Sequence, residues 1–214
     1  MNRQEIIQKI EDIGIVAVIR LNGSDNLAKI IEALANGGVR ALEITMTTPN
    51  AIEIIREISQ TLSSEFLIGA GTVLDSDTAE AVINAGSQFV VSPVFKPEII
   101  ETVHKFDKAV LPGAFSATEI LSAWEAGADI VKVFPATVVG PGYFKDIHGP
   151  LPQIKLTPTG GVTVENAEEF IRCGAVCLGV GSALLDRHMI QNQDWHGLEE
   201  RARQFKAAVD RGRR

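Results

Sequence analysis

Two reactive side chains sit inside apolar segments of the sequence, where charged residues are uncommon. Lys132 lies in the run VKVFPA, and Glu43 lies in the run ALEIT. In an apolar interior an unpaired charge costs several kcal/mol, so such a group finds a partner or becomes neutral. A buried ion pair between the two is the ordinary explanation. The alternative is functional: an amine beside a carboxylate can act as nucleophile and general base in imine chemistry.

The segments that carry these two residues belong to a series of short β-rich runs. The runs begin at Ile15, Ala41, Leu67, Phe89, Ala109, Ile130, Lys155 and Cys177. Stretches with helical apolar spacing, such as DNLAKIIEALANGG, separate them, and several end in glycine. Eight strands that alternate with helices predict a parallel α/β fold, specifically a (β/α)8 TIM barrel. A doubly wound open sheet is the alternative, but IVAVIRLNGSD lacks the G-x-G-x-x-G dinucleotide fingerprint.

Length and composition favour one domain spanning residues 1–214, because 214 residues with 45% hydrophobic side chains suffice for one compact core. We expect an N-terminal helix in MNRQEIIQKIEDIG and a short, solvated basic tail in DRGRR. No apolar stretch approaches the roughly 20 residues that span a bilayer, which predicts a cytoplasmic protein without a membrane partner. The formal net charge of −7 argues against a nucleic-acid partner.

The metal-binding residue types show no ligand pattern. Cys173 and Cys177 match neither a CxxC redox pair nor a zinc motif, and they are interpreted as buried thiols. The four histidines are scattered along the chain. The sequence therefore predicts neither a metal site nor a cofactor.

Polar residues gather near the carboxyl ends of the predicted strands, where a barrel holds its catalytic groups. If the Ile and Leu side of each strand faces the helices, alternation predicts that Arg20, Glu43, Thr72 and Lys132 point into one barrel mouth. Each has an ordinary explanation when taken alone. Together, an amine, a carboxylate and an anion-binding guanidinium suit imine chemistry on a small-molecule keto acid.

Two glycine-rich turns follow the last two predicted strands. They are TPTGGV at 157–162 and GVGSAL at 179–184. Barrels commonly hold phosphate at this position, on backbone N–H groups and a helix N-terminus. The alternative is that the turns need glycine only for their tight backbone geometry. Both turns occur at the expected strands, which favours phosphate binding.

Seven motifs in order resemble one enzyme family. VAVIR, LEIT, GAGTV, VSP, VKVFPA, PTGGV and GVGSAL, between Ile15 and Leu184, are similar to the pyruvate-dependent class I aldolases. These enzymes cleave 2-keto-3-deoxy-6-phosphogluconate (KDPG) and 4-hydroxy-2-oxoglutarate (KHG). The resemblance implies that Lys132 forms the Schiff base and that Glu43 is the general acid/base. It also implies a homotrimer of (β/α)8 barrels without metal or organic cofactor, in a sugar-acid (Entner–Doudoroff) or hydroxyproline-type route.

The resemblance also assigns substrate-binding roles. It implies that Thr72, Pro93 and Phe134 shape the pyruvyl pocket. The predicted site for the phosphate or distal carboxylate comprises Thr159, Gly160, Gly161, Gly179 and Ser182.

One position departs from the pattern. Many family members carry arginine four residues after the catalytic glutamate, where this chain has Thr47. We therefore expect Arg20, at the end of the first strand, to bind the substrate carboxylate. Two other functions stay open at this point: a phosphate-binding TIM-barrel synthase or isomerase, and a non-catalytic phosphosugar-binding protein.

Overall fold

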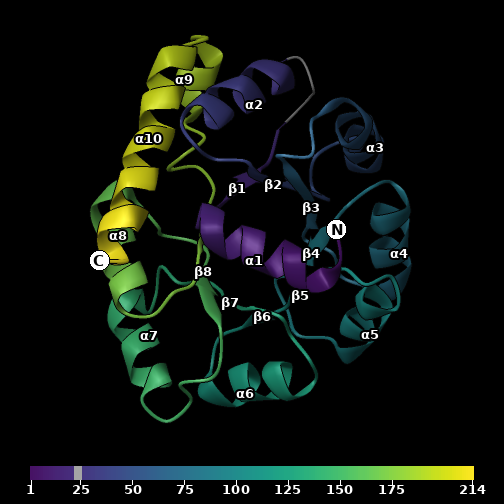
Figure 1. Ribbon diagram of the computed structural model, residues 1–214, viewed down its shortest axis with the longest axis vertical. Helices are drawn as coiled ribbons and strands as arrows, with labels where there is room; N and C mark the ends of the chain where they lie inside the picture. The colour runs from purple at the N-terminus through teal and green to yellow at the C-terminus, as the bar shows by residue number, and fades with distance from the viewer. Residues whose placement is uncertain (22–25) are drawn as a thin grey trace.

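The computed structural model describes residues 1–21 and 26–214, in which helices and parallel strands alternate (Figure 1). The strands are Ile15–Ile19 (β1), Ala41–Thr45 (β2), Leu67–Gly71 (β3), Phe89–Val91 (β4), Ala109–Leu111 (β5), Gly113–Ala114 (β6), Val131–Val133 (β7), Leu156–Pro158 (β8) and Leu178–Val180 (β9). The helices are Arg3–Ile13 (α1), Leu27–Asn36 (α2), Ala51–Thr61 (α3), Ser76–Asn84 (α4), Pro97–Lys105 (α5), Ala117–Glu125 (α6), Gly140–His148 (α7), Val164–Arg172 (α8), Arg187–Gln191 (α9) and Trp195–Gly212 (α10).

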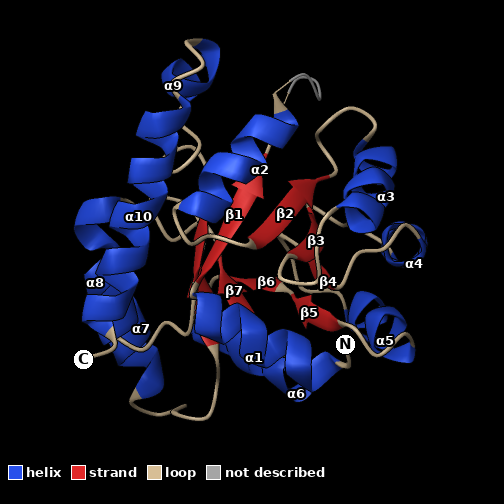
Figure 2. Cartoon of the chain, turned by 45° about the horizontal axis from the view of Figure 1, so that its top comes forward, coloured by secondary structure: helices blue, strands red, loops and turns tan. Residues whose placement is uncertain are grey.

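The strands lie at the centre and the helices surround them (Figure 2). Hydrogen bonds order the strands as β5-β4-β3-β2-β1-β9 and as β6-β7-β8, and every pairing within these sheets is parallel. Each predicted β-rich run contains a strand. The prediction of a parallel α/β fold is therefore confirmed.

The fifth predicted strand is divided in two. Pro112 separates β5 from β6, because proline has no N–H to donate to a sheet. Its carbonyl oxygen still accepts a hydrogen bond from the Lys132 N–H, at 2.9 Å. On the other side of β7 and β8, isolated parallel bridges join Leu156 to Ala175 and Thr159 to Gly179.

Alternate strand residues pack into two apolar clusters. The larger cluster lies between strands and helices and includes Ile19, Leu42 and Ile44. The smaller one joins strand residues such as Phe89 to one face of α1. α1 crosses one end of the strands (Figure 1), and Ile6, Ile7 and Ile10 contribute its buried face. The smaller cluster is thus covered at the amino ends of the strands.

The beginning and end of α1 follow from its sequence. The Asn2 side chain accepts a hydrogen bond from the Glu5 N–H, and the Glu5 carboxylate accepts one from the Asn2 N–H, which forms a capping box. Gly14 ends the helix at a φ of 74°, a left-handed conformation that glycine adopts without steric cost. The predicted N-terminal helix is confirmed.

The C-terminal basic residues Arg211, Arg213 and Arg214 are exposed to solvent, although part of the segment is helical. Asp210 to Gly212 are helical and complete α10. Arg211 donates to the Glu168 carboxylate at 2.7 Å, and Arg213 donates to the carbonyl oxygens of Glu11 and Asp12. These partners hold the basic segment against the protein, a set of contacts that the local sequence does not indicate. Among the described helices, none has the length and apolar composition needed to cross a membrane.

The buried face of α1 leads to a stability prediction. Ile10 is fully buried against the smaller cluster, so Ile10→Ala should lower the free energy of unfolding by about 2–5 kcal/mol. Urea denaturation followed by circular dichroism measures this change. Gln4→Ala, on the exposed face of the same helix, should change it by less than about 0.5 kcal/mol. Similar small effects of both variants would show that α1 does not support the core.

Candidate active site

Glu43 and Lys132 are both buried, although they come from strands of different sheets. Glu43 lies in β2 and is 2% exposed, and Lys132 lies in β7 and is 5% exposed. The Glu43 Oε1 atom is fully buried and has no hydrogen-bond partner among the described residues. Native proteins rarely leave a buried carboxylate oxygen unpaired, so this atom marks a functional-site candidate.

The two side chains interact electrostatically without forming an ion pair. The described residues include no pair between Glu43 and Lys132 within 4.0 Å. Burial nevertheless raises the pKa of Glu43, and the charges of Lys132 and Arg20 oppose this rise. The Lys132 Nζ lies 5.2 Å from the centre of the Phe134 ring. The ordinary explanation of a contact ion pair therefore does not hold for these two residues.

Glycines near the carboxyl ends of the strands make room for these groups. A Cβ atom on Gly71 would overlap the Glu43 carboxyl group, so any larger residue would displace it. A Cβ atom on Gly113 would overlap the backbone of Pro93. Gly71 and Gly113 lie in GAGTV and AVLPG, but nothing local in these segments distinguishes them from other glycines.

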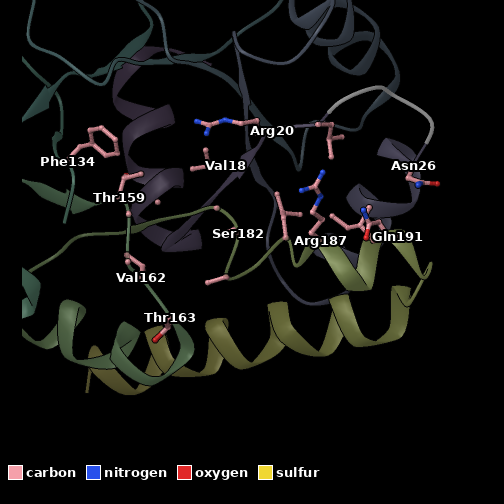
Figure 3. Close-up of a pocket in the computed structure, with 18 residues that line it drawn as sticks. Val18, Arg20, Asn26, Phe134, Thr159, Val162, Thr163, Ser182, Arg187 and Gln191 are labelled. Atoms are coloured by element: carbon pink, nitrogen blue, oxygen red, sulfur yellow. The ribbon is translucent and has the colours of Figure 1, made fainter. Parts of the chain in front are cut away.

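A cavity of about 870 Å³ lies beyond the carboxyl ends of β1, β8 and β9 (Figure 3). Most predicted substrate-binding residues line it: Arg20, Phe134, Thr159, Gly160, Gly161, Gly179 and Ser182. Glu43 and Lys132 are not among the lining residues. They adjoin it, because Val18, the β1 partner of Glu43, and Phe134, the neighbour of the Lys132 amine, both line the wall.

Thr72 and Pro93 lie outside this lining. Strand alternation places Thr72 on the same side of β3 as Ile68 and Ala70. Both of these residues pack in the larger cluster on the helix side, so the predicted orientation of Thr72 by alternation was wrong. Thr72 comes after the end of β3 with a φ of 59°, so the alternation does not extend to it. A non-glycine residue at positive φ is uncommon, and such positions occur disproportionately at functional sites.

The glycine turns present unpaired backbone donors. The N–H groups of Gly160, Gly161 and Ser182 donate to no backbone acceptor in the described part of the chain. Gly160 and Gly161 have φ values of 90° and 72°, which explains why the first turn requires glycine. Successive free N–H groups at such a turn form a ready anion site.

The cavity is also cationic. Arg20 and Arg187 are the charged residues among the described lining residues. Arg187, Gln191 and Asn26 extend the wall beyond the predicted set, on the side of α9 and α2. Arg187 and Gln191 lie beyond the last motif, which ends at Leu184, and Asn26 lies in no motif. A basic residue shortly after GVGSAL, in LLDRHMI, was the available signal.

Most of the chain matches one known protein family. A family model described as KDPG and KHG aldolase matches residues 6–200. The chain belongs to this aldolase family. The enzyme class is therefore that of carbon–carbon lyases, as the motifs predicted.

Individual relatives of this KDPG and KHG aldolase family member are also named as aldolases. A 2-dehydro-3-deoxy-phosphogluconate aldolase of Pseudomonas aeruginosa is 36% identical over 192 residues, which cover 89% of this chain and 86% of the relative. A 2-dehydro-3-deoxy-6-phosphogalactonate aldolase of Escherichia coli is 34% identical over 171 residues, covering 79% and 83%. A KHG/KDPG aldolase of the same species is 30% identical, with 89% of each chain covered.

Two solved structures have a similar fold, but they differ in how similar their sequences are to this chain. KDPG aldolase from Legionella pneumophila, with pyruvate captured as a covalent carbinolamine, has a TM-score of 0.85 and 30% identity over 92% of this chain and 96% of that one. A 3-hexulose-6-phosphate synthase from Salmonella typhimurium has a TM-score of 0.76 at 13% identity, covering 93% and 99%. The synthase shares the fold alone.

The raised pKa of Glu43 predicts a pH-dependent effect of Glu43→Gln. Between the ordinary value of 4.5 and the raised value, folded Glu43 keeps a proton that the unfolded chain releases. This contribution to wild-type stability is complete below about 4.5 and is lost as pH rises. Glutamine does not titrate, so Glu43→Gln should gain stability relative to the wild type as pH rises. Urea unfolding at several pH values from about 4 to 8 measures the free energy of unfolding of both proteins. If the value for Glu43→Gln minus that for the wild type stayed constant or fell as pH rises, the raised pKa would be contradicted.

Proposed function

We propose that this protein is a class I aldolase that cleaves KDPG to pyruvate and glyceraldehyde 3-phosphate. KHG, which would give pyruvate and glyoxylate, is the second candidate substrate. The observation that carries this proposal is the buried pair of Glu43 and Lys132, which interact without a contact ion pair beside a cationic cavity. The names of the relatives support KDPG as the substrate.

The reaction begins at Lys132. Its neutral amine attacks the C2 carbonyl carbon of the keto acid, and loss of water leaves a protonated imine. The imine draws electrons from the C3–C4 bond. Phe134 lies against the amine, and with Thr72 and Pro93 it would bound the pyruvyl portion of the substrate.

Glu43 supplies the proton transfer. Its carboxylate takes the proton of the C4 hydroxyl, directly or through a water molecule, as the C3–C4 bond breaks and the aldehyde leaves. The raised pKa brings this carboxyl closer to neutral pH, where a general base is most effective. No described donor holds the Glu43 Oε1 atom, so no internal hydrogen bond competes with this proton transfer at that oxygen. Protonation of the enamine at C3 and hydrolysis of the imine then release pyruvate and restore the amine.

Two sets of groups would hold the substrate, one charged and one made of backbone donors. Arg20 lines the cavity and follows β1, the strand paired with β2 of Glu43, so its guanidinium would bind the C1 carboxylate. The free N–H groups of Gly160, Gly161 and Ser182, with Thr159 and Gly179 beside them, would bind the phosphate. This mechanism uses no metal and no organic cofactor.

We further propose that the two sheets form one closed (β/α)8 barrel within a single domain of residues 1–214. The Lys132-to-Pro112 hydrogen bond supports continuity at one junction, and the bridge between Thr159 and Gly179 supports it at the other. A closed barrel would bring Glu43 on β2 and Lys132 on β7 toward a common interior.

The assembly we propose is a cytoplasmic homotrimer. Leu74, Val94, Phe115 and Val138 follow β3, β4, β6 and β7, and all are large apolar residues exposed by 39–72%. Their burial between copies would remove this apolar surface from water. One similar structure is a protein cage designed by fusing symmetric oligomeric domains, with a TM-score of 0.85 and 30% identity over 94% of this chain and 73% of that one.

Trapping the imine tests the function. Incubation with pyruvate and borohydride should add a reduced pyruvyl group to Lys132, located by digestion and mass spectrometry. Glu43→Gln should still form this adduct but lose roughly 10²- to 10⁴-fold in turnover of KDPG, because only the general base is removed. A synthase, an isomerase or a non-catalytic binding protein would give no adduct. An adduct on another lysine would contradict the assignment of Lys132.

The proposed role of Arg20 has its own test. Arg20→Met should lower kcat/KM for KDPG by roughly 10- to 150-fold, which corresponds to the loss of about 1.5–3 kcal/mol of charge-assisted hydrogen bonding. Steady-state kinetics measures the change. Adding Thr47→Arg, at the position where many relatives carry arginine, should recover part of the loss. An unchanged kcat/KM in Arg20→Met would mean that another group binds the carboxylate.

A further inference from the structure

The short helix α9 brings a second arginine to the wall of the cavity. Arg187 begins α9, and Ile190 and Gln191 of the same helix also line the cavity. In Figure 3 the side chains of Arg187 and Gln191 lie on the Asn26 side, whereas Phe134 and Thr159 lie on the opposite side. Arg187 forms no ion pair with any residue that the structure describes. Its charge is therefore directed at the cavity without a described acidic partner.

Local contacts fix the segment that carries Arg187. The N–H groups of Leu184 and Leu185 both donate to the Gly181 carbonyl oxygen, at 3.0 and 2.9 Å. The Asp186 carboxylate accepts from the N–H groups of His188 and Met189, at 2.8 and 3.1 Å, and these bonds contribute to the lowered pKa of Asp186. Asp186 is thus engaged as the cap of α9. The turn after β9, which carries Ser182, and the start of α9 form one connected wall.

The two cavity arginines are placed for different anions. Arg20 follows β1, which pairs with the Glu43 strand β2, so it belongs to the reacting end of the cavity, and its charge opposes the rise of the pKa of Glu43. Arg187 comes from α9 on the far side of Ser182 from Thr159 (Figure 3). The turn N–H groups are neutral and cannot balance a dianion by themselves. A guanidinium at their outer side can do so with paired hydrogen bonds.

We propose that Arg187 is a specificity-determining residue that binds the terminal phosphate dianion of the substrate, together with the turn N–H groups. This inference rests on the aldolase function proposed above. KDPG carries its phosphate on C6, whereas KHG carries its distal carboxylate directly on C4. With C2 of each keto acid bonded to Lys132, the phosphate extends further along the cavity than the carboxylate. Arg187 therefore distinguishes the two substrates by reach and by charge.

Steady-state kinetics with both keto acids tests the assignment. Arg187→Met should raise KM for KDPG by roughly 5- to 50-fold, a range reduced from that of a fully buried contact because Arg187 is exposed. KM for KHG and imine formation with pyruvate should change by less than about two-fold, because neither places an anion at Arg187. Arg187→Lys should fall between the wild type and Arg187→Met, since it keeps the charge but loses the paired geometry.

A matched control and a binding measurement complete the test. Arg172→Met removes an exposed arginine outside the cavity, where Glu168 keeps Arg211 as a partner, and KM for KDPG should stay unchanged. A ³¹P NMR titration with inorganic phosphate requires no turnover, and Arg187→Met should bind phosphate at least about five-fold more weakly than the wild type.

The outcomes separate this inference from the proposed function. An unchanged KM for KDPG in Arg187→Met, or equal rises for KDPG and KHG, would overturn the role of Arg187 and leave the aldolase activity standing. Absence of a pyruvate adduct in the wild type would overturn the aldolase function. Phosphate binding that depends on Arg187 would still support the anion site in that case.

Discussion

The structure depends on a carboxylate that is buried without a hydrogen-bond partner. Glu43 is enclosed by strands, and the described residues leave its Oε1 unpaired. Burial favours the neutral acid, while Lys132 and Arg20 favour the charged base. Neither cation makes a contact pair with it among the described residues. Burial and the two cations therefore act in opposite directions on the pKa of Glu43, and such tuning of a carboxyl group suits a general acid/base.

Several features of the fold serve this constraint. Gly71 keeps open the space that the carboxyl group occupies, since any Cβ there would overlap it. α1 covers the apolar interior at the amino ends of the strands, so the opposite ends are free to carry polar groups. The stable part of the molecule and its reactive part are thus placed at opposite ends of the same strands, as in other parallel α/β proteins.

The cavity extends this arrangement outward. Its inner end adjoins the buried pair through Val18 and Phe134, the glycine turns lie along its wall, and α9 bounds its outer end. Neutral donors on the turns and cations at both ends suit an elongated molecule with two anionic groups. Our proposals assign the inner anion to Arg20 and the outer one to Arg187. Substrate choice in this protein would then depend on residues outside the strands that carry the chemistry.

The sequence by itself determined the α/β fold, the aldolase family and the unusual positions of Lys132 and Glu43. Apolar runs that alternate with helical segments indicate which residues are buried, and motifs in a fixed order identify a family. Both signals can be found in the sequence because each is local in the chain. Only the tertiary structure decided that the two residues interact without a contact pair, that Gly71 makes room for Glu43, and that Arg187 joins the cavity. It also corrected the alternation at Thr72, which follows the strand in a left-handed conformation, and it showed the long-range hydrogen bonds of Arg211 and Arg213. The reason is physical: distances and electrostatic fields between distant segments arise from packing, which no local pattern of residues encodes.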